Sequence, residues 1–526
     1  MKNALHTASL ILLLFLAASA ASFAEDTAVD YFNRGNAKFS KGDLDGAMAD
    51  YTQAIELNPK LSEAYLGRGS VRKNKGELDE AIADYTRAIE INPKYSEVYD
   101  NRGVAKKAKG DLVGAIKDYN HAIELNPKLS TAYSNRGAYK DDMGDRDGAI
   151  ADYNQAIELN PKSCKPYYNR GNTMKAKGDL DKAIDDYNRA IELNPKLGEA
   201  YGNRGLAKSA KGDFEGAIAD FNQVIEINPK DSTAYTARGL AKQDKGLLDD
   251  AIKDYNQAIE INPKDGNAYY DRGNAKQAKG DPDGAIADYN QTIDINPNFA
   301  EAYTNRGTAK RNKGDLDAAG ADFTQAIKIN PELFEAYFNR GVTNKAKGDL
   351  DGAIADLHRA IELNPKYSEA YYGLAECDQF KSNWNNALSE YRHASEHSMR
   401  RELQDYCHLS IWIIRTRLGD RQAADKELAA HMEKGSNTPT DWASKVAGHL
   451  LGTVTEVDLI AAAESPDARK KNGQVCEAWY YVGMKKLFAG DKKSAADDFR
   501  KCIATKQEDF TECKFANAEL KALGEP

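Results

Sequence analysis

The strongest constraint on this chain is a unit of 34 residues that is repeated ten times, from about residue 28 to residue 367. An Arg-Gly pair marks the same position in every copy, and no insertion or deletion separates the copies. A fixed period of this length is typical of a solenoid, in which each short unit is stacked on the next. The ten pairs are Arg34-Gly35, Arg68-Gly69, Arg102-Gly103, Arg136-Gly137, Arg170-Gly171, Arg204-Gly205, Arg238-Gly239, Arg272-Gly273, Arg306-Gly307 and Arg340-Gly341.

Each copy predicts two helices. In the second copy we expect them to span about Ser62–Asn74 and Asp79–Ile91. Gly76 is suited to end the first helix, because glycine adopts the left-handed conformation at no steric cost. Asp79 is predicted to cap the second helix by accepting hydrogen bonds from its first-turn amides. The second helix ends before Pro93, since proline cannot continue it.

Packing positions recur in every copy. In the second copy, Gly69 and Ala81 are small enough to let the two helices approach closely, while Tyr65 and Tyr85 supply large aromatic area beside them. With Pro93 they reproduce the aromatic, Gly, Ala, aromatic, Pro pattern of the tetratricopeptide repeat (TPR) family, which this chain resembles over ten strict and up to three looser copies. The resemblance implies an all-α fold, an α-solenoid that forms a right-handed superhelix of stacked antiparallel helix hairpins, with a degenerate helical C-terminal region.

Residues 1–24 resemble a signal peptide. Lys2 gives a short positive start, an apolar run without charge follows, and Ala24 stands where a signal peptidase would cleave. The run is too short to span a bilayer. No cysteine near the cleavage site offers a lipid anchor, and no later stretch predicts a transmembrane segment. We therefore expect an exported, soluble protein that is periplasmic or secreted.

Three further segments follow the signal. Residues 28–367 hold the ten tandem repeats. Residues 368–470 form a degenerate TPR-like helical region, where Leu374-Ala375 replaces the Arg-Gly pair. Residues 471–526 predict a TPR-like helix pair and a capping helix, because Gly483 and Gly490 restore the spacing of the repeat. An atypical last unit is expected of a solenoid, whose final apolar face must be covered.

Charge and cysteine content exclude some functions. The net charge of −9 leaves no basic surface of the kind that binds nucleic acid.

Six cysteines are present and five follow residue 370. In an oxidising compartment they can pair, and Cys502 with Cys513 is one candidate bridge. Six cysteines allow 15 full pairings, so the connectivity stays open, as does the alternative of free buried thiols.

An aspartate accompanies the repeated arginine in every copy, 16 residues later. Because the two positions lie near the contact between the antiparallel helices, we expect an Arg–Asp ion pair inside each hairpin or across to the next. A partly buried charge needs a partner, so these residues are interpreted as structural. Representative pairs are Arg68 with Asp84, Arg170 with Asp186 and Arg306 with Asp322.

The resemblance implies that the first helices line the inner face of the superhelix and form a peptide-binding groove. Residues at the groove positions vary from copy to copy, as expected either of a binding face or of ordinary solvated surface. The pattern of Lys, Asn and Arg that forms the family's carboxylate clamp for chaperone tails is not present. The cationic and polar candidates that suit an acidic or extended peptide are Lys73, Lys107, Asn172, Lys175, Asn274, Arg311 and Lys345.

One motif has a catalytic alternative. His393 and His397 match the H-x-x-E-H pattern of a class of metalloproteases, and histidines four apart on a helix can share a zinc ion. However, Ala394 occupies the small packing position of the eleventh unit, and no third ligand is evident. We therefore interpret this segment as the end of a second TPR helix.

The sequence favours a protein without enzymatic activity, metal or cofactor, which acts as a protein–protein interaction scaffold or adaptor of the bacterial periplasm or cell envelope. We expect it to bind a peptide or protein on the concave face. Two alternatives remain: a metal-dependent hydrolase centred on His393 and His397, and a self-associating envelope spacer.

Overall fold

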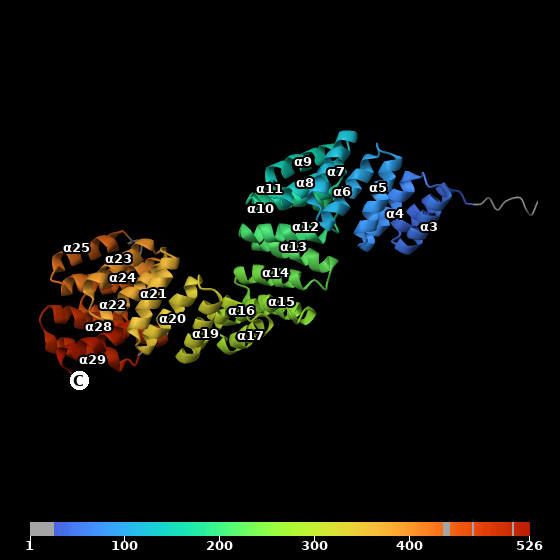
Figure 1. The fold of residues 1–526 in the computed structure, drawn as a ribbon. Coiled ribbons are helices and arrows are strands. Elements are labelled where there is room, and N and C mark those ends of the chain that lie inside the picture. Colours follow the sequence, from blue (N-terminus) through green and yellow to red (C-terminus); the bar gives the residue numbers. More distant parts are fainter. Residues whose placement is uncertain (1–25, 435–441, 465–467, 508–509, 526) are drawn as a thin grey trace, which may run out of the picture. The chain divides into compact units, whose positions relative to one another are not determined.

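A computed structural model describes residues 26–434, 442–464, 468–507 and 510–525 of the chain. The expected signal peptide at residues 1–24 lies outside these described residues. Within them there are 29 helices and no strand, which confirms the all-α prediction. The chain divides into two compact units, one ending at Leu247 and the other beginning at Leu248, which are described separately (Figure 1).

The first unit is a series of helix hairpins, in which an even-numbered first helix packs against the odd-numbered second helix that follows it. Its helices are α2 (Ala28–Ser40), α3 (Leu44–Leu57), α4 (Ser62–Lys75), α5 (Leu78–Ile91), α6 (Ser96–Lys109), α7 (Leu112–Leu125), α8 (Ser130–Asp142), α9 (Arg146–Leu159), α10 (Cys164–Ala176), α11 (Leu180–Leu193), α12 (Gly198–Ala210), α13 (Phe214–Ile227) and α14 (Ser232–Asp244).

The second unit continues the hairpins and ends in a more irregular group of helices. Its helices are α15 (Leu248–Ile261), α16 (Gly266–Ala278), α17 (Pro282–Ile295), α18 (Ala300–Asn312), α19 (Leu316–Ile329), α20 (Phe334–Lys347), α21 (Leu350–Leu363), α22 (Ser368–Phe380), α23 (Trp384–His397), α24 (Arg401–Arg417), α25 (Arg421–Glu433), α26 (Trp442–Leu451), α27 (Glu456–Ala462), α28 (Ala468–Phe488), α29 (Lys492–Ala504) and α30 (Thr511–Leu523).

The helix ends follow from local chemistry. Gly76 ends α4 with a φ of 83°, as predicted. The prediction that Asp79 caps α5 is wrong, because α5 begins at Leu78 and its N-cap is Glu77, which makes no side-chain cap. Other hairpins carry aspartate at the position of Glu77. In the first hairpin Asp43 accepts a hydrogen bond of 2.9 Å from the backbone of Gly46.

In most hairpins of the repeats an aromatic ring packs against a glycine, and in the tenth hairpin Leu357 takes the place of the ring. A Cβ atom at Gly69 would lie 2.7 Å from Cε1 of Tyr85, so only glycine fits beneath this ring. Tyr85 and Ala81 are fully buried at that contact. The buried apolar residues of the repeats form separate clusters, most of only three residues, because each hairpin packs mainly on its neighbours.

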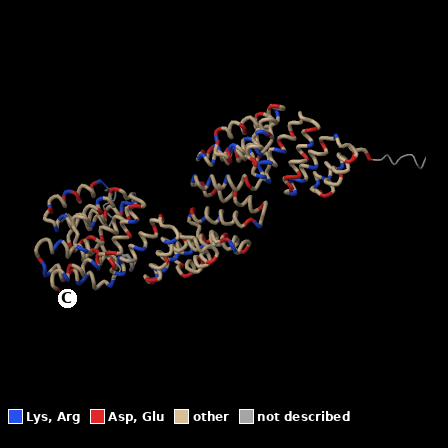
Figure 2. The backbone as a smooth tube through the Cα atoms, in the orientation of Figure 1, with Lys and Arg blue, Asp and Glu red and all other residues tan. Residues whose placement is uncertain are grey.

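Exposed ion pairs join consecutive hairpins. In each, a lysine at the end of a first helix contacts an acidic residue 30 positions earlier, at the start of the preceding second helix; Nζ of Lys75 and Oδ1 of Asp45 are 2.9 Å apart. Both signs of charge are visible along each unit (Figure 2). The pairs are Lys75–Asp45, Lys109–Asp79, Lys177–Asp147, Lys211–Asp181, Lys245–Glu215, Lys279–Asp249, Lys313–Asp283, Lys347–Asp317 and Lys381–Asp351.

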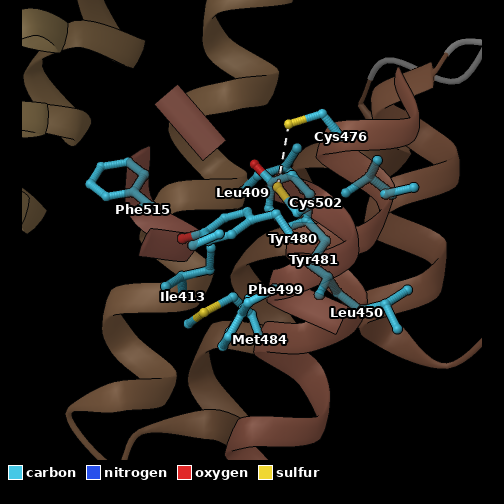
Figure 3. Packing of buried hydrophobic residues seen from close by; sticks show 14 of the residues in the cluster. Leu409, Ile413, Leu450, Cys476, Tyr480, Tyr481, Met484, Phe499, Cys502 and Phe515 are labelled. Carbon is cyan, nitrogen blue, oxygen red and sulfur yellow. Dashed lines mark hydrogen bonds between the residues drawn. The ribbon is translucent and has the colours of Figure 1, made fainter. Parts of the chain in front are cut away.

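The C-terminal helices share one large core. This cluster holds 24 of the described buried residues, contributed by helices α24 to α30, and several of its side chains are seen in Figure 3. Helix α30 also reaches the eleventh hairpin: Thr511 donates a 2.8 Å hydrogen bond to Glu376, and the rings of Phe515 and Phe380 stack at 4.3 Å. None of the described helices is both long and apolar enough to cross a membrane.

Candidate functional site on the first helices

The repeated arginine and aspartate form a bidentate ion pair inside the hairpin. Nε and Nη2 of Arg68 donate to the two carboxylate oxygens of Asp84 at 2.9 and 2.8 Å. Arg170 meets Asp186 in the same way at 2.8 and 2.6 Å, and Arg306 meets Asp322 at 3.0 and 2.7 Å. These aspartates are nearly buried, at 4 to 6 % exposure. A planar guanidinium suits this geometry, because its donors match a carboxylate pairwise.

The same arginine also contacts the preceding hairpin, which the sequence prediction did not specify. Nη1 of Arg306 donates to Oδ1 of Asn290 at 2.7 Å, and Nη1 of Arg136 donates to Asn120 at 2.8 Å. Each repeated arginine also lies over the ring of the tyrosine three residues earlier, as Arg306 does over Tyr303 at 5.3 Å. One side chain therefore joins its own hairpin and links it to the previous one.

The eleventh hairpin lacks this arrangement. Leu374 replaces the arginine, while Glu390 keeps the acidic position on the second helix. Its neighbour is Asp378 rather than a cation, and Oε2 of Glu390 is buried without a hydrogen-bond partner. Burial, reinforced by the Asp378 charge, raises the pKa of Glu390 to about 8. This hairpin therefore holds two facing carboxyl groups where the repeats hold an ion pair.

Most of the seven groove candidates contact the next first helix. Nζ of Lys107 is 2.7 Å from Oδ2 of Asp142, Lys175 donates to Asn203 at 2.6 Å, and Arg311 donates to Asn339 at 3.0 Å. Lys345 forms an ion pair with Glu376. These side chains therefore join successive hairpins, a role that sequence reasoning missed. The contact partners are Asp142, Asn203, Asn339 and Glu376.

The two asparagine candidates accept hydrogen bonds from the hydroxyl groups of buried tyrosines. Oδ1 of Asn172 accepts a 2.8 Å hydrogen bond from the hydroxyl of Tyr187. Asn274 accepts from Tyr289 at 2.8 Å and from the amide of Asn305 at 2.9 Å. A buried hydroxyl is costly without a partner, so these asparagines serve the hairpins that contain them.

Lys73 differs from the other candidates. Its side chain is partly buried on α4, and among the described residues its ammonium has neither a hydrogen bond nor an ion pair. Burial lowers its pKa. Lys73 lines a cavity of about 460 Å³ whose walls come from α4, α6, α8 and α10, the first helices of four consecutive hairpins.

A polar network lies in the walls of this cavity. Nζ of Lys165 donates to Oδ1 of Asn135 at 3.1 Å, and the Asn135 amide donates to Asp100 at 2.9 Å. Asp100 is 5 % exposed, and burial raises its pKa. The Ser134 hydroxyl is 4 % exposed and has no hydrogen-bond partner. The cavity is thus lined by two ammonium groups, by the carboxyl groups of Glu97 and Asp100 and by an unsatisfied hydroxyl.

The histidine motif lies on an exposed helix end. His393 and His397 are exposed, and their ring centroids are 6.2 Å apart. Nδ1 of His397 faces the backbone oxygen of His393 at 2.9 Å, and both rings pack on Tyr371. The part of the chain that the structure describes contains no group of three His, Cys, Asp or Glu side chains placed to hold a metal.

The structure is therefore that of a helical repeat protein in which four consecutive first helices line a polar cavity. Family models described as TPR repeat match residues 35–76, 69–110, 142–178, 243–280 and 307–348. Models described as tetratricopeptide repeat match residues 96–129, 164–197, 198–231, 266–299, 288–321 and 334–367. These matches span more than half of the chain, so the chain belongs to the tetratricopeptide repeat family.

Solved structures of the same fold class are also similar to this chain. Yeast Tom70 is 16% identical and covers 76% of this chain and 99% of its own, with a TM-score of 0.40. A tetratricopeptide repeat protein from Parabacteroides merdae is 24% identical over 47% of this chain and 98% of its own, with a TM-score of 0.39. YrrB, described as a TPR protein with an unusual peptide-binding site, is 25% identical over 36% of this chain and 96% of its own, with a TM-score of 0.30.

Proposed function

We propose that this protein is a non-catalytic scaffold that binds an extended, acidic segment of a partner protein in the cavity between α4 and α10. The observation that supports it most is Lys73, a partly buried cation that makes no hydrogen bond or ion pair with a described residue and lines the same cavity as the unsatisfied hydroxyl of Ser134. The other groove cations are already paired within the chain.

The chemistry of the cavity selects the ligand class. A partly desolvated ammonium gains most from a carboxylate, because the interaction is stronger where water is scarce. Lys165 adds a second positive charge at the rim, and the Ser134 hydroxyl can donate to a peptide carbonyl. Since the four first helices are already in place, little ordering entropy is lost by the scaffold on binding.

The proposal includes a location. Residues 1–24 carry the features of a signal peptide, so we place the mature protein in the periplasm or outside the cell, where its partners would be envelope or secreted proteins. Mass spectrometry of the mature N-terminus from fractionated cells tests this part separately. An intact Met1 on the cellular protein would contradict it.

Photo-crosslinking tests the binding site. A photoreactive residue at Asn101, which lines the cavity, should capture a partner from the cell envelope, whereas the same residue at exposed Lys94 should not. Lys73→Gln should weaken binding of the captured partner about 10-fold, the loss of one buried charge-assisted contact of about 1.5 kcal/mol. Lys94→Gln is the matched control.

Two results would overturn the proposal. Equal capture from Asn101 and Lys94 would show that the cavity is not the contact surface. If light scattering shows that the purified chain assembles with itself and capture recovers only this protein, the self-associating spacer is the better function.

A further inference from the structure

Three buried cysteines meet at the centre of the C-terminal core. Cys476 on α28 and Cys502 on α29 are fully buried, and Cys513 on α30 is 2 % exposed. The sulfur atoms of Cys476 and Cys502 are 3.3 Å apart (Figure 3). Cys513 also lies within hydrogen-bonding reach of the Cys476 sulfur. Cys476 is therefore the shared neighbour of the other two thiols.

The surroundings of Cys476 favour its thiolate. The contact with the Cys502 thiol lowers the pKa of Cys476, and the Thr505 hydroxyl lowers it further. The same contact, together with burial, raises the pKa of Cys502. Two buried cysteines outside the cluster behave differently, since burial raises the pKa of both Cys377 and Cys407 to about 12. Thiol–disulfide chemistry proceeds through the thiolate.

We propose that Cys476 and Cys502 form a disulfide bond, and that Cys513 can replace Cys502 in this bond by exchange at the Cys476 sulfur. The sulfur atoms of a disulfide are about 2.05 Å apart, so a small side-chain rotation closes the 3.3 Å gap. The pairing of Cys502 with Cys513 is a candidate from the sequence, whereas the sulfur–sulfur distance of 3.3 Å is between Cys476 and Cys502.

The oxidant is a disulfide such as oxidised glutathione. When the C-terminal core opens locally and exposes Cys476, its thiolate attacks one glutathione sulfur, a mixed disulfide forms, and a first glutathione thiolate leaves. The Cys502 thiolate then attacks the Cys476 sulfur and displaces the second glutathione as its thiolate. The two thiol protons of the protein end on the two released glutathione molecules, so two cysteines are oxidised while one disulfide is reduced.

Exchange would change which helices are covalently joined. The Cys476–Cys502 bond joins α28 to α29, whereas a Cys476–Cys513 bond joins α28 to α30. Helix α30 is the element that contacts the eleventh hairpin through Thr511 and Phe515. The choice of partner therefore decides whether α30 is held to α28 by a covalent bond or by packing alone.

Disulfide mapping tests the proposal on the full chain. The protein is equilibrated with oxidised and reduced glutathione, quenched with acid, alkylated, digested without reductant and analysed by mass spectrometry. We expect a linked peptide pair containing Cys476 and Cys502, while Cys377 and Cys407 are recovered alkylated. Recovery of all three clustered thiols in alkylated form, or a Cys502–Cys513 pair as the main product, would overturn the proposal.

Single substitutions identify Cys476 as the shared sulfur. Cys502→Ala should give the Cys476–Cys513 bond, and Cys513→Ala should leave the Cys476–Cys502 bond unchanged. Cys476→Ala should abolish both bonds without producing a Cys502–Cys513 bond. Formation of that third bond in Cys476→Ala would contradict the central role of Cys476. Circular dichroism shows whether each variant folds, and the result on the unsubstituted chain decides the proposal even if one does not.

Discussion

The repeats and the C-terminal helices bury their apolar side chains in different ways. Hairpins of the array bury small, separate clusters and depend on contacts with the hairpins beside them. Helices α24 to α30 pool their apolar side chains into one core. Since stability in a stacked array is nearly a sum of local terms, a defect in the array should stay local, whereas a defect in the shared core should spread.

The largest expected loss of stability comes from replacing a phenylalanine that occupies the same repeat position in both regions. Phe323 and Phe499 both pack a fully buried ring against the first-helix glycine, Gly307 and Gly483. Each Phe→Ala change should cost about 3–5 kcal/mol. Hydrogen exchange should show Phe323→Ala loosening α18, α19 and their neighbours, and Phe499→Ala loosening α24 to α30 together. If faster hydrogen exchange in Phe499→Ala were confined to α28 and α29, it would contradict the view that a defect in the shared core spreads.

The next effect concerns the ion pairs of the array. Asp186→Ala removes one partner of a buried pair and leaves the Arg170 guanidinium uncompensated, which should cost about 3 kcal/mol. This cost is at the lower end of the range for breaking a buried ion pair, because the Arg170 side chain is 22% exposed. Its neighbour Asp185 is exposed, so Asp185→Ala is the matched control and should change stability by less than about 0.5 kcal/mol. Chemical denaturation of both variants measures the difference, and equal midpoints would refute a stabilising role for the pair.

The eleventh hairpin should be sensitive to pH. Glu390 has its pKa raised from 4.5 to about 8 in the folded protein, so the folded state holds this proton more tightly than the unfolded state. Its contribution to stability is complete below pH 4.5 and is lost as the pH rises through about 8. Glu390→Gln should remove this dependence and stabilise the protein by about 1–3 kcal/mol above pH 8.

Thermal unfolding between pH 5 and pH 9 checks this expectation. Asp498 is the equivalent residue of the last hairpin and is paired with Lys486 and Lys501 at 2.7 and 2.8 Å. Asp498→Asn should therefore destabilise the protein across this range. If Glu390→Gln and the unsubstituted chain have parallel pH profiles, Glu390 is not protonated in the folded state.

The smallest effect concerns glycines. Gly69→Ala would force a Cβ atom against the buried Tyr85 ring and should cost about 1–3 kcal/mol. Gly320 lies inside α19 with no heavy atom within 4 Å of its ideal Cβ, so Gly320→Ala should stabilise the protein by about 0.4–1 kcal/mol. Melting temperatures of the two variants should move in opposite directions, and a shift of the same sign would contradict this account.

Much of the fold could be predicted from the sequence because each hairpin is specified locally and repeated. Predicted helices over Ser62–Asn74 and Asp79–Ile91 differ from α4 and α5 by one residue at one end. The capping residue of α5 was placed wrongly because both Glu77 and Asp79 are acidic and near the start, and only the backbone distinguishes them.

The candidate site was less predictable. Whether a groove lysine is free or paired depends on the residue that the next first helix presents, as with Lys107 facing Asp142. The cavity near Lys73 combines side chains from four hairpins, including Ser134, and no single repeat encodes it. Likewise, the proximity of Cys476 to Cys502 arises in an irregular region where the 34-residue period no longer guides the prediction.

The exposed lysine–acid pairs between hairpins make the array sensitive to dissolved salt. Each is individually weak, worth about 0–1 kcal/mol, but they recur along both units and all respond to dissolved salt together. Raising the ionic strength weakens every one of them at once, whereas the buried Arg–Asp pairs inside the hairpins are screened much less. The exposed part of the contact between hairpins is therefore sensitive to ionic strength, while the ion pair inside each hairpin is not.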